Sequence, residues 1–240
     1  MCAEALLDFP SLYSCFHQPI TSLDCGQKCA PYNQGAVPFC CDTRHAVPIA
    51  YHAEWAYLQS HTDLWHLWQP PQPTEAARLQ AQTPEGQVLI ECQGYQRCQR
   101  MVRSITCRAF PFFPYLSREG ELLGLSYYWD FEDRCWVISH LESVSPQFIG
   151  EFIAAYEAIF QAYPTELAAF RHHATIMRRV FGRRKRTILL LHRRGGIYRI
   201  SPGTGRLRKV KPGTTPKFGP YLIGSKLSFP DEIPAGQVPK

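Results

Sequence analysis

Residues 23–42 read LDCGQKCAPYNQGAVPFCCD and place four cysteines within seventeen positions, the last two side by side. The whole chain has 240 residues and ten cysteines. Thiols at this density are typical of a disulfide framework, a redox centre or a metal site. The rest of the sequence indicates which of these three kinds of structure the cysteines form.

The N-terminal segment shows no sign of export. Residues 1–19 read MCAEALLDFPSLYSCFHQP, with no basic region and no apolar run long enough for a signal peptide. No apolar stretch of the chain approaches the roughly 20 residues of a membrane span. We therefore expect a soluble, cytoplasmic protein with no membrane partner, in which clustered cysteines bind metal or do redox chemistry rather than form disulfides. Export of the protein would reverse that preference.

A second group of cysteines follows the first after fifty residues, and a predicted helix lies between them. Metal sites often take half of their ligands from each of two loops, and tetrahedral zinc requires four thiolate or imidazole ligands at about 2.0–2.3 Å. We therefore expect the metal ligands to come from the cysteines of the two groups. These are Cys25, Cys29, Cys40, Cys41, Cys92, Cys98 and Cys107.

The adjacent pair Cys40–Cys41 restricts how the ligands are shared. Neighbouring side chains on an extended backbone point to opposite faces, so the two thiols would rarely face one ion. Either one is a ligand and the other packs as a small hydrophobe, or the two serve neighbouring metals or different irons of one cluster. The number of thiols allows two mononuclear sites or one iron–sulfur cluster, such as a [4Fe–4S] cluster, with spare cysteines.

Other residues could extend this set. Cys2, Cys15 and Cys135 are equally consistent with buried thiols, because free cysteine is among the most buried residue types. His45, four residues after Cys41, is the histidine placed to act as a ligand, although a packed or surface histidine is the commoner role.

Positive charge surrounds the second cysteine group. There is no acidic residue between Cys92 and Glu119, but there are several arginines. Four thiolates on a divalent ion leave a net charge of about −2, which guanidinium groups would offset while lowering the thiol pKa values. Of these arginines we expect Arg103 and Arg108 to lie beside the metal ligands; a solvated basic loop is the alternative.

The pattern of apolar residues predicts an α+β fold. Helices are expected at residues 48–61, 75–81, 147–163 and 165–181, and strands at 121–131 and 134–140. Three further strands, at 186–192, 196–201 and 205–210, would form a basic β-meander before a proline-rich tail. We expect a cysteine-cluster metal-binding domain at residues 1–144, with residues 145–240 packed on it.

The order of these motifs resembles the YkgJ-type cysteine-cluster family, whose members are described as zinc- or iron-chelating proteins. The resemblance covers about residues 20–115 and is most specific at residues 107–111, which read CRAFP. Arg103-Ser104 stands where the family has Arg-Pro, and ten residues precede the double cysteine. The resemblance implies a zinc or iron centre. Some relatives resemble flagellin lysine methylases, which keeps a cluster-dependent enzyme as an alternative.

The C-terminal part is strongly basic. Residues 171–211 hold fourteen lysines and arginines and no acid, whereas residues 1–170 hold nine basic and eighteen acidic residues. Such a segment can attract nucleic acid or another polyanion, or it can dock on the acidic part of the same chain. The candidate polyanion-binding residues are Arg183, Arg184, Lys185, Arg186, Arg193 and Arg194.

The sequence names no reaction. Its glycine-rich stretches lie in predicted hairpin turns rather than in a phosphate-binding loop, and no Ser-His-Asp or Cys-His set has a recognisable local context. Catalytic residues are therefore unknown. The sequence favours a cytoplasmic metal-binding protein, with a nucleic-acid-binding module scaffolded by zinc and a cluster-dependent enzyme as alternatives.

Overall fold

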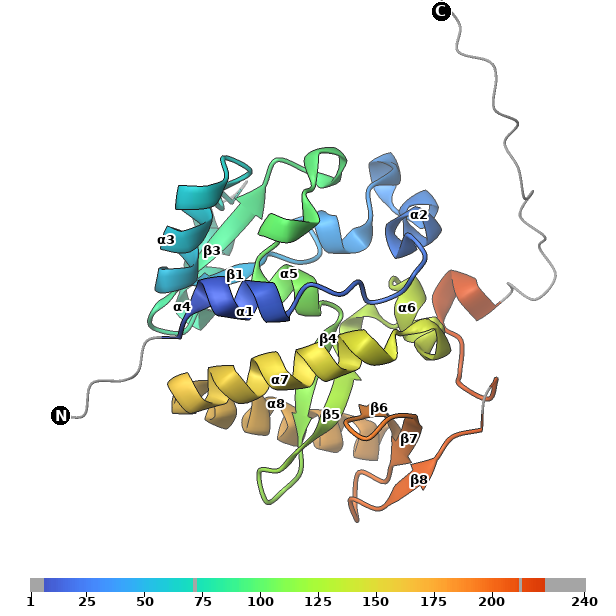
Figure 1. The fold of residues 1–240 in the computed structure, drawn as a ribbon. Coiled ribbons are helices and arrows are strands. Elements are labelled where there is room, and N and C mark those ends of the chain that lie inside the picture. Colours follow the sequence, from blue (N-terminus) through green and yellow to red (C-terminus); the bar gives the residue numbers. More distant parts are fainter. Residues whose placement is uncertain (1–6, 71–72, 212, 223–240) are drawn as a thin grey trace, which may run out of the picture.

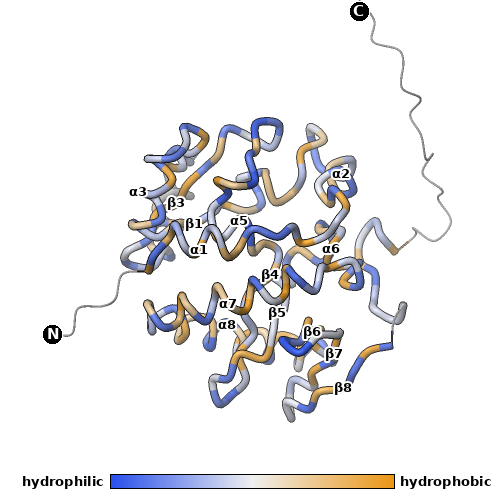
Figure 2. Tube along the Cα trace, viewed as in Figure 1, coloured by the Kyte–Doolittle hydropathy of each residue, from blue (hydrophilic) through white to orange (hydrophobic). Residues whose placement is uncertain are grey.

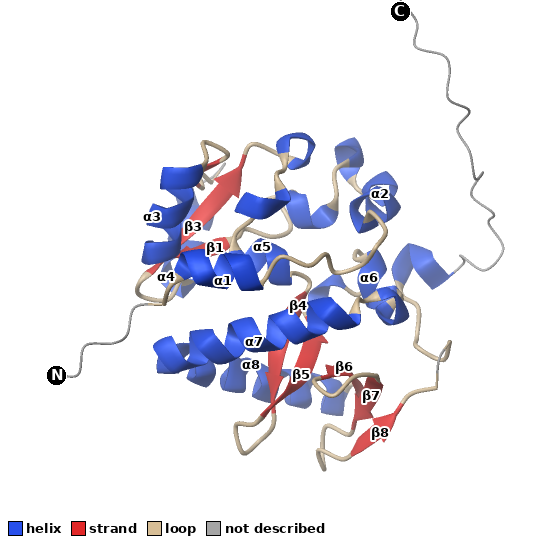
Figure 3. Cartoon of the chain, viewed as in Figure 1, coloured by secondary structure: helices blue, strands red, loops and turns tan. Residues whose placement is uncertain are grey.

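The computed structural model describes residues 7–70, 73–211 and 213–222, and its fold is α+β, as the sequence predicts (Figure 3). The α-helices are α1 (Phe9–Cys15), α2 (Cys25–Cys29), α3 (His52–His61), α4 (Pro73–Gln82), α5 (Ile105–Ala109), α6 (Trp136–Ser139), α7 (Pro146–Ala162) and α8 (Pro164–Arg183). The strands are β1 (Ile49–Tyr51), β2 (Trp65–Leu67), β3 (Gln87–Cys92), β4 (Phe112–Leu116), β5 (Leu122–Tyr127), β6 (Ile188–His192), β7 (Ile197–Ile200) and β8 (Leu207–Lys209). The 3-10 turns are η1 (Ala30–Tyr32), η2 (Gln34–Ala36), η3 (Phe39–Cys41), η4 (Tyr95–Arg97), η5 (Arg100–Val102), η6 (Trp129–Phe131), η7 (Leu141–Ser143) and η8 (Gly219–Leu222).

The larger sheet is antiparallel and has the strand order β4-β5-β6-β7-β8. Its two faces are covered by different helices, α7 on one side and α8 on the other (Figure 1). Phe112 and Leu191 face α7, whereas Phe113 and Leu190 face α8. Because both faces are buried, these strands read as continuous apolar runs rather than as alternating ones.

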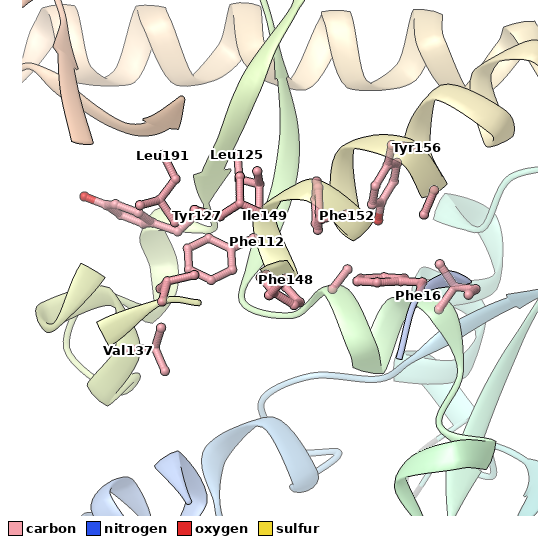
Figure 4. Packing of buried hydrophobic residues seen from close by; sticks show 14 of the residues in the cluster. Phe16, Phe112, Leu125, Tyr127, Val137, Phe148, Ile149, Phe152, Tyr156 and Leu191 are labelled. Atoms are coloured by element: carbon pink, nitrogen blue, oxygen red, sulfur yellow. The ribbon is translucent and has the colours of Figure 1, made fainter. Parts of the chain in front are cut away.

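Helix α7 packs both against the larger sheet and against the segment that follows α1. Its N-terminus is capped by Ser145, whose side chain accepts a hydrogen bond from the N–H of Phe148. Phe148 lies between the ring of Phe112 in the sheet, at 6.1 Å, and the ring of Phe16 after α1, at 5.7 Å. Figure 4 shows these rings together with Phe152, which meets Phe16 edge-on. The main core therefore runs without a break from the sheet to the N-terminal helix.

The smaller sheet has the order β1-β3-β2 and lies with α3 in the other part of the molecule (Figure 1). Next to it are residues 17–48 and 92–110, which contain seven of the cysteines and which we call the cysteine region. Apart from Cys92 at the end of β3, its regular elements are α2, α5 and 3-10 turns. We call residues 112–127 and 146–209, which form the larger sheet with α7 and α8, the sheet region.

Two local predictions from sequence were wrong, and one strand was not predicted. Residues 134–140, expected to be a strand, contain the short helix α6, in which the consecutive residues Val137 and Ile138 are both buried. The helix expected at residues 48–61 begins only at His52, since Ile49–Tyr51 pair with β3. The aromatic run at residues 110–116 contains an edge strand, β4, that the sequence analysis did not assign.

The predicted boundary at residue 144 lies between two paired strands. Strand β5 precedes it and β6 follows it, and they meet through Gly124 opposite His192 and Leu125 opposite Leu191. Gly124 has a φ of +156°, and a Cβ atom there would lie 2.1 Å from the carbonyl oxygen of Leu191. Only glycine fits this approach. The larger sheet thus takes strands from both predicted domains, while the division itself stays a prediction.

The last described residues lie against the N-terminal part. The hydroxyl of Tyr221 donates to the carbonyl oxygen of Arg134, and its ring meets Tyr32 edge-on at 5.6 Å. Most of the predicted proline-rich tail, residues 223–240, lies outside the described residues.

Candidate metal centre

A cavity of about 830 Å³ lies among the cysteine segments, and we call it the thiol cavity. Both cysteine groups reach it, although fifty residues of sequence separate them. The cysteines that line it are Cys25, Cys40, Cys41, Cys92, Cys98 and Cys107.

Helix α2 positions the first two cysteines. Cys25 and Cys29 are its first and last residues, one helical turn apart, so they share one face of the helix. Asp24 caps this helix by accepting hydrogen bonds from the N–H groups of Gly26, at 3.0 Å, and Gln27, at 3.4 Å. Cys25 lines the thiol cavity, whereas Cys29 lines a smaller cavity beside it.

The adjacent cysteines lie in a 3-10 turn. Residues Phe39–Cys41 form η3, so the argument from an extended backbone does not apply to them. The Sγ atoms of Cys40 and Cys41 are 3.9 Å apart, and both residues line the thiol cavity. At that separation the two sulfurs can belong to one thiolate site or to two neighbouring metals, so both alternatives from the sequence stay open.

The second group comes from three consecutive pieces of chain. Cys92 ends β3, Cys98 follows the turn η4, and Cys107 lies in α5. The buried side chain of Ser104 caps α5 and accepts a hydrogen bond from the N–H of Cys107 at 3.2 Å. The cap fixes where α5 begins and hence where Cys107 points.

Burial keeps most of these thiols protonated. It raises the pKa of Cys25 to about 11, with the negative charge of Cys29 adding to the effect. It likewise raises the pKa of Cys107 to about 12, to which the charges of Cys41 and Cys92 contribute. The pKa of Cys41 is lowered instead, chiefly by its hydrogen bond with Cys40. These mutual effects show that the sulfurs lie within electrostatic range of one another.

The two arginines expected beside the thiols have different positions. The Nε of Arg103 donates to the Sγ of Cys98 at 3.0 Å, as expected of a group that offsets thiolate charge. The guanidinium of Arg108 is buried and donates to backbone carbonyl oxygens rather than to a thiol. These are the carbonyl oxygens of Tyr13, Phe16, Met101 and Arg103. Arg108 therefore joins the cysteine region to the segment after α1.

Glu54 is a further positioning residue, which the sequence analysis left without a role. Its side chain is fully buried and accepts hydrogen bonds from the Tyr13 hydroxyl at 2.8 Å and from the N–H of Ile105 at 2.6 Å. The second bond holds the start of α5, two residues before Cys107. Burial raises the pKa of Glu54 to about 7. In the sequence, the sign of this role is that Glu54 lies four residues before Leu58, on the buried face of α3.

The remaining candidates are spread over several environments. The Nε2 of His45 lies 3.2 Å from the side-chain oxygen of Asn33, and the residue lines the thiol cavity. Cys15 is exposed, Cys135 lines the smaller cavity, and Cys2 lies outside the described residues. Within the described ranges, no three His, Cys, Asp or Glu side chains lie close enough together to hold a metal ion as they stand.

Two of the basic residues expected to bind a polyanion pair with acids of the same chain. Arg186 binds Glu132 with N–O distances of 2.7 and 2.8 Å, and Arg193 binds Glu157 at 2.6 Å. The other four, which are Arg183, Arg184, Lys185 and Arg194, have exposed side chains. Figure 2 shows hydrophilic segments along this part of the chain, near β6 and β8.

A scan against protein-family models, a search of curated proteins and a search of solved structures found no match to this chain. The resemblance of residues 20–115 to the YkgJ-type family therefore stays a prediction. Among the helices of the described residues, none combines the length and the apolar character that crossing a membrane requires.

Proposed function

We propose that the protein binds a metal centre through cysteine thiolates at the thiol cavity. The observation that carries this proposal is the convergence of six thiols, from segments far apart in sequence, on one cavity. Unrelated buried thiols pack singly as small hydrophobes, and they have no reason to face a common space. The resemblance to a zinc- or iron-chelating family supports the same conclusion.

The surroundings of the cavity suit thiolate ligands. Arg103 supplies both positive charge and a hydrogen bond at the sulfur of Cys98. Hydrogen bonds to ligand sulfurs of this kind tune thiolate-bound metals. Soft thiolates select zinc, copper(I) or iron–sulfur clusters. A cavity of about 830 Å³ is far larger than one ion needs, and four of its thiols would suffice for a [4Fe–4S] cluster. An iron–sulfur cluster is therefore the occupant that we favour over zinc.

Metal analysis of the full-length chain, purified without oxygen, tests this proposal. We expect iron with acid-labile sulfide and a visible absorption that reduction bleaches; zinc without sulfide would support a thiolate centre but not a cluster. Cys98→Ser should lose the centre in the thiol cavity. Cys15→Ser should keep it, because Cys15 is exposed and does not line the cavity. Wild-type protein that contains neither iron nor zinc would overturn the proposal.

A cluster-dependent enzyme is the second candidate, because the cavity is not filled by its thiols alone. It continues to aromatic residues, including Tyr128, Tyr156 and Phe170, and so leaves room for an organic substrate beside the centre. The test is methyl transfer from S-adenosylmethionine to lysine in a protein substrate, as the resemblance suggests. Cys107→Ala protein that stays folded should lose this activity. No methyl transfer by cluster-loaded wild-type protein would exclude this reaction.

Binding of a polyanion is a further candidate for the end of α8. Arg183, Arg184 and Lys185 are exposed there, and they form no ion pair with another residue of the part of the chain that the structure describes. Binding to RNA or DNA should weaken steeply with salt, because it depends on release of counterions. Replacing these three residues with glutamate should abolish it, whereas binding that is insensitive to salt and to these changes would contradict it.

A further inference from the structure

A second, smaller cavity lies beside the thiol cavity and is also lined by cysteines. Its volume is about 30 Å³. Four of its lining residues are Cys25, Cys29, Cys40 and Cys135. The described residues that complete its wall are all apolar, namely Ile20, Gly26, Phe39, Phe110, Pro111, Phe131 and Val137. The four sulfurs are thus the side-chain heteroatoms that this wall offers to a ligand.

Three separate segments bring these four thiols together. Cys25 and Cys29 lie on one face of α2, and Cys40 lies in η3. Cys135 precedes α6, whose residues pack against α2. Cys135 is 28 positions beyond Cys107 and outside both predicted cysteine groups, so nothing in the spacing of the sequence connects it with them.

The environment of Cys135 is that of a thiol close to other sulfurs. Burial raises its pKa to about 12, and the negative charges of Cys25 and Cys29 act in the same direction. The backbone of Ile138 and Val137 acts in the opposite direction.

The distribution of thiols between the two cavities divides them into two sets of four. Cys29 and Cys135 line the small cavity alone, while Cys25 and Cys40 line both cavities. Four further thiols, Cys41, Cys92, Cys98 and Cys107, line the thiol cavity alone. Assigning the two shared residues to the small cavity gives each cavity the four ligands of a complete thiolate site. The division then falls between the adjacent residues Cys40 and Cys41.

We propose that Cys25, Cys29, Cys40 and Cys135 bind a second metal, a single tetrahedral zinc or ferrous ion, beside the centre held by Cys41, Cys92, Cys98 and Cys107. The inference rests on the proposed function, because it assigns a second part of the same thiol cluster. A volume of about 30 Å³ admits one ion but not the core of a four-iron cluster. The apolar wall excludes water, as in closed structural sites.

Binding has a defined proton balance. Each of the four thiols gives its proton to solvent and its sulfur lone pair to the ion, so one divalent ion displaces four protons. The site then carries a net charge of about −2. No three of the described thiols already stand at single-ion distances, so the sulfurs must turn inward to reach about 2.3 Å from the ion.

The test counts metals per chain by native mass spectrometry and elemental analysis on anaerobically purified full-length protein. We expect the wild type to carry one single ion in addition to the centre in the thiol cavity. Cys135→Ser and Cys29→Ser should each lose the single ion and keep the other centre. Cys98→Ser should keep the single ion and lose the centre in the thiol cavity. Cys15→Ser should keep both.

Failure of this inference can be told apart from failure of the proposed function. Wild-type protein without any metal overturns both. A metal in the thiol cavity, with a count that Cys135→Ser and Cys29→Ser leave unchanged, overturns only the second site. If those variants do not fold, X-ray absorption of the wild-type protein decides: four sulfur ligands at about 2.3 Å around the single ion support the site, and nitrogen or oxygen ligands contradict it.

Discussion

In the sheet region two helices of 17 and 20 residues cover a sheet whose edge strand β4 is buried at every position, whereas the helices of the cysteine region, α2 and α5, have five residues each. Apolar burial on two faces stabilises the sheet region. Capping side chains, buried polar contacts and thiols hold the cysteine region together. The sheet region thus depends mainly on apolar burial, while the cysteine region requires particular partners, one of which we propose to be a metal.

The largest expected effect separates the two regions directly. Removing the metal should cost the cysteine region a free energy on the order of 10 kcal/mol, the scale of thiolate zinc sites in small domains. Hydrogen exchange should then show loss of amide protection at residues 23–45 and 92–110 but retained protection at residues 112–127 and 146–192. Equal loss of amide protection in both regions would contradict the prediction that only the cysteine region depends on the metal.

A substitution in the shared core should destabilise both regions together. Phe148 is fully buried between rings of the sheet and of the N-terminal segment, so Phe148→Ala should lower the free energy of unfolding by about 3–5 kcal/mol. Denaturant unfolding of the metal-loaded protein measures this. Leu67→Ala, at a side chain 51% exposed, is the control and should change it by less than about 0.5 kcal/mol. If Phe148→Ala destabilises only one of the two regions, the regions unfold independently and α7 does not couple them.

The polar contact that holds α5 should give the cysteine region a pH dependence. The folded-state pKa of Glu54 is raised from 4.5 to about 7, so the folded protein binds this proton more tightly than the unfolded chain does. Its contribution to the free energy of unfolding should therefore fall as pH rises from about 4.5 to about 7, by at most about 3 kcal/mol, and stay level above pH 7.

Glu54→Gln should remove that part of the slope, because the amide does not titrate. The measurement is the difference between the wild-type and variant unfolding free energies at several pH values, in which the other titrating groups cancel. A difference that does not vary between pH 4.5 and pH 7 would contradict the raised pKa of Glu54.

The smallest effect is expected at the surface of the sheet region. The pair Arg193–Glu157 is largely exposed, so Glu157→Gln should cost less than about 1 kcal/mol, and salt should reduce this further. Glu132→Gln should cost more, because Glu132 is buried and also accepts a hydrogen bond from the Tyr127 hydroxyl. Equal losses at the two sites would show that burial does not set the strength of these contacts.

The sheet region was the more predictable from sequence. The four-residue spacing of Phe148, Phe152 and Tyr156 predicted α7, and the glycine-rich turns predicted the meander of β6, β7 and β8. Strand β4 was missed because burial on both faces removes the alternation that marks a strand, and Pro114 argued against one. Proline is tolerated there because β4 is at the edge of the sheet.

The candidate site was predictable only in part. The spacing of the two cysteine groups predicted a common site, and six of those thiols line one cavity. Cys135 and Glu54 could not be assigned, since their positions depend on the packing of α6 on α2 and of α3 on α5. Arg108 lines the thiol cavity, but its guanidinium donates to backbone carbonyl oxygens, and these contacts depend on the path of the chain around α1.

The close approach of Gly124 to the carbonyl oxygen of Leu191 limits how the sequence of this sheet can change in evolution. A related protein that pairs β5 with β6 in the same register must keep glycine at position 124, however far the rest of its sequence has diverged.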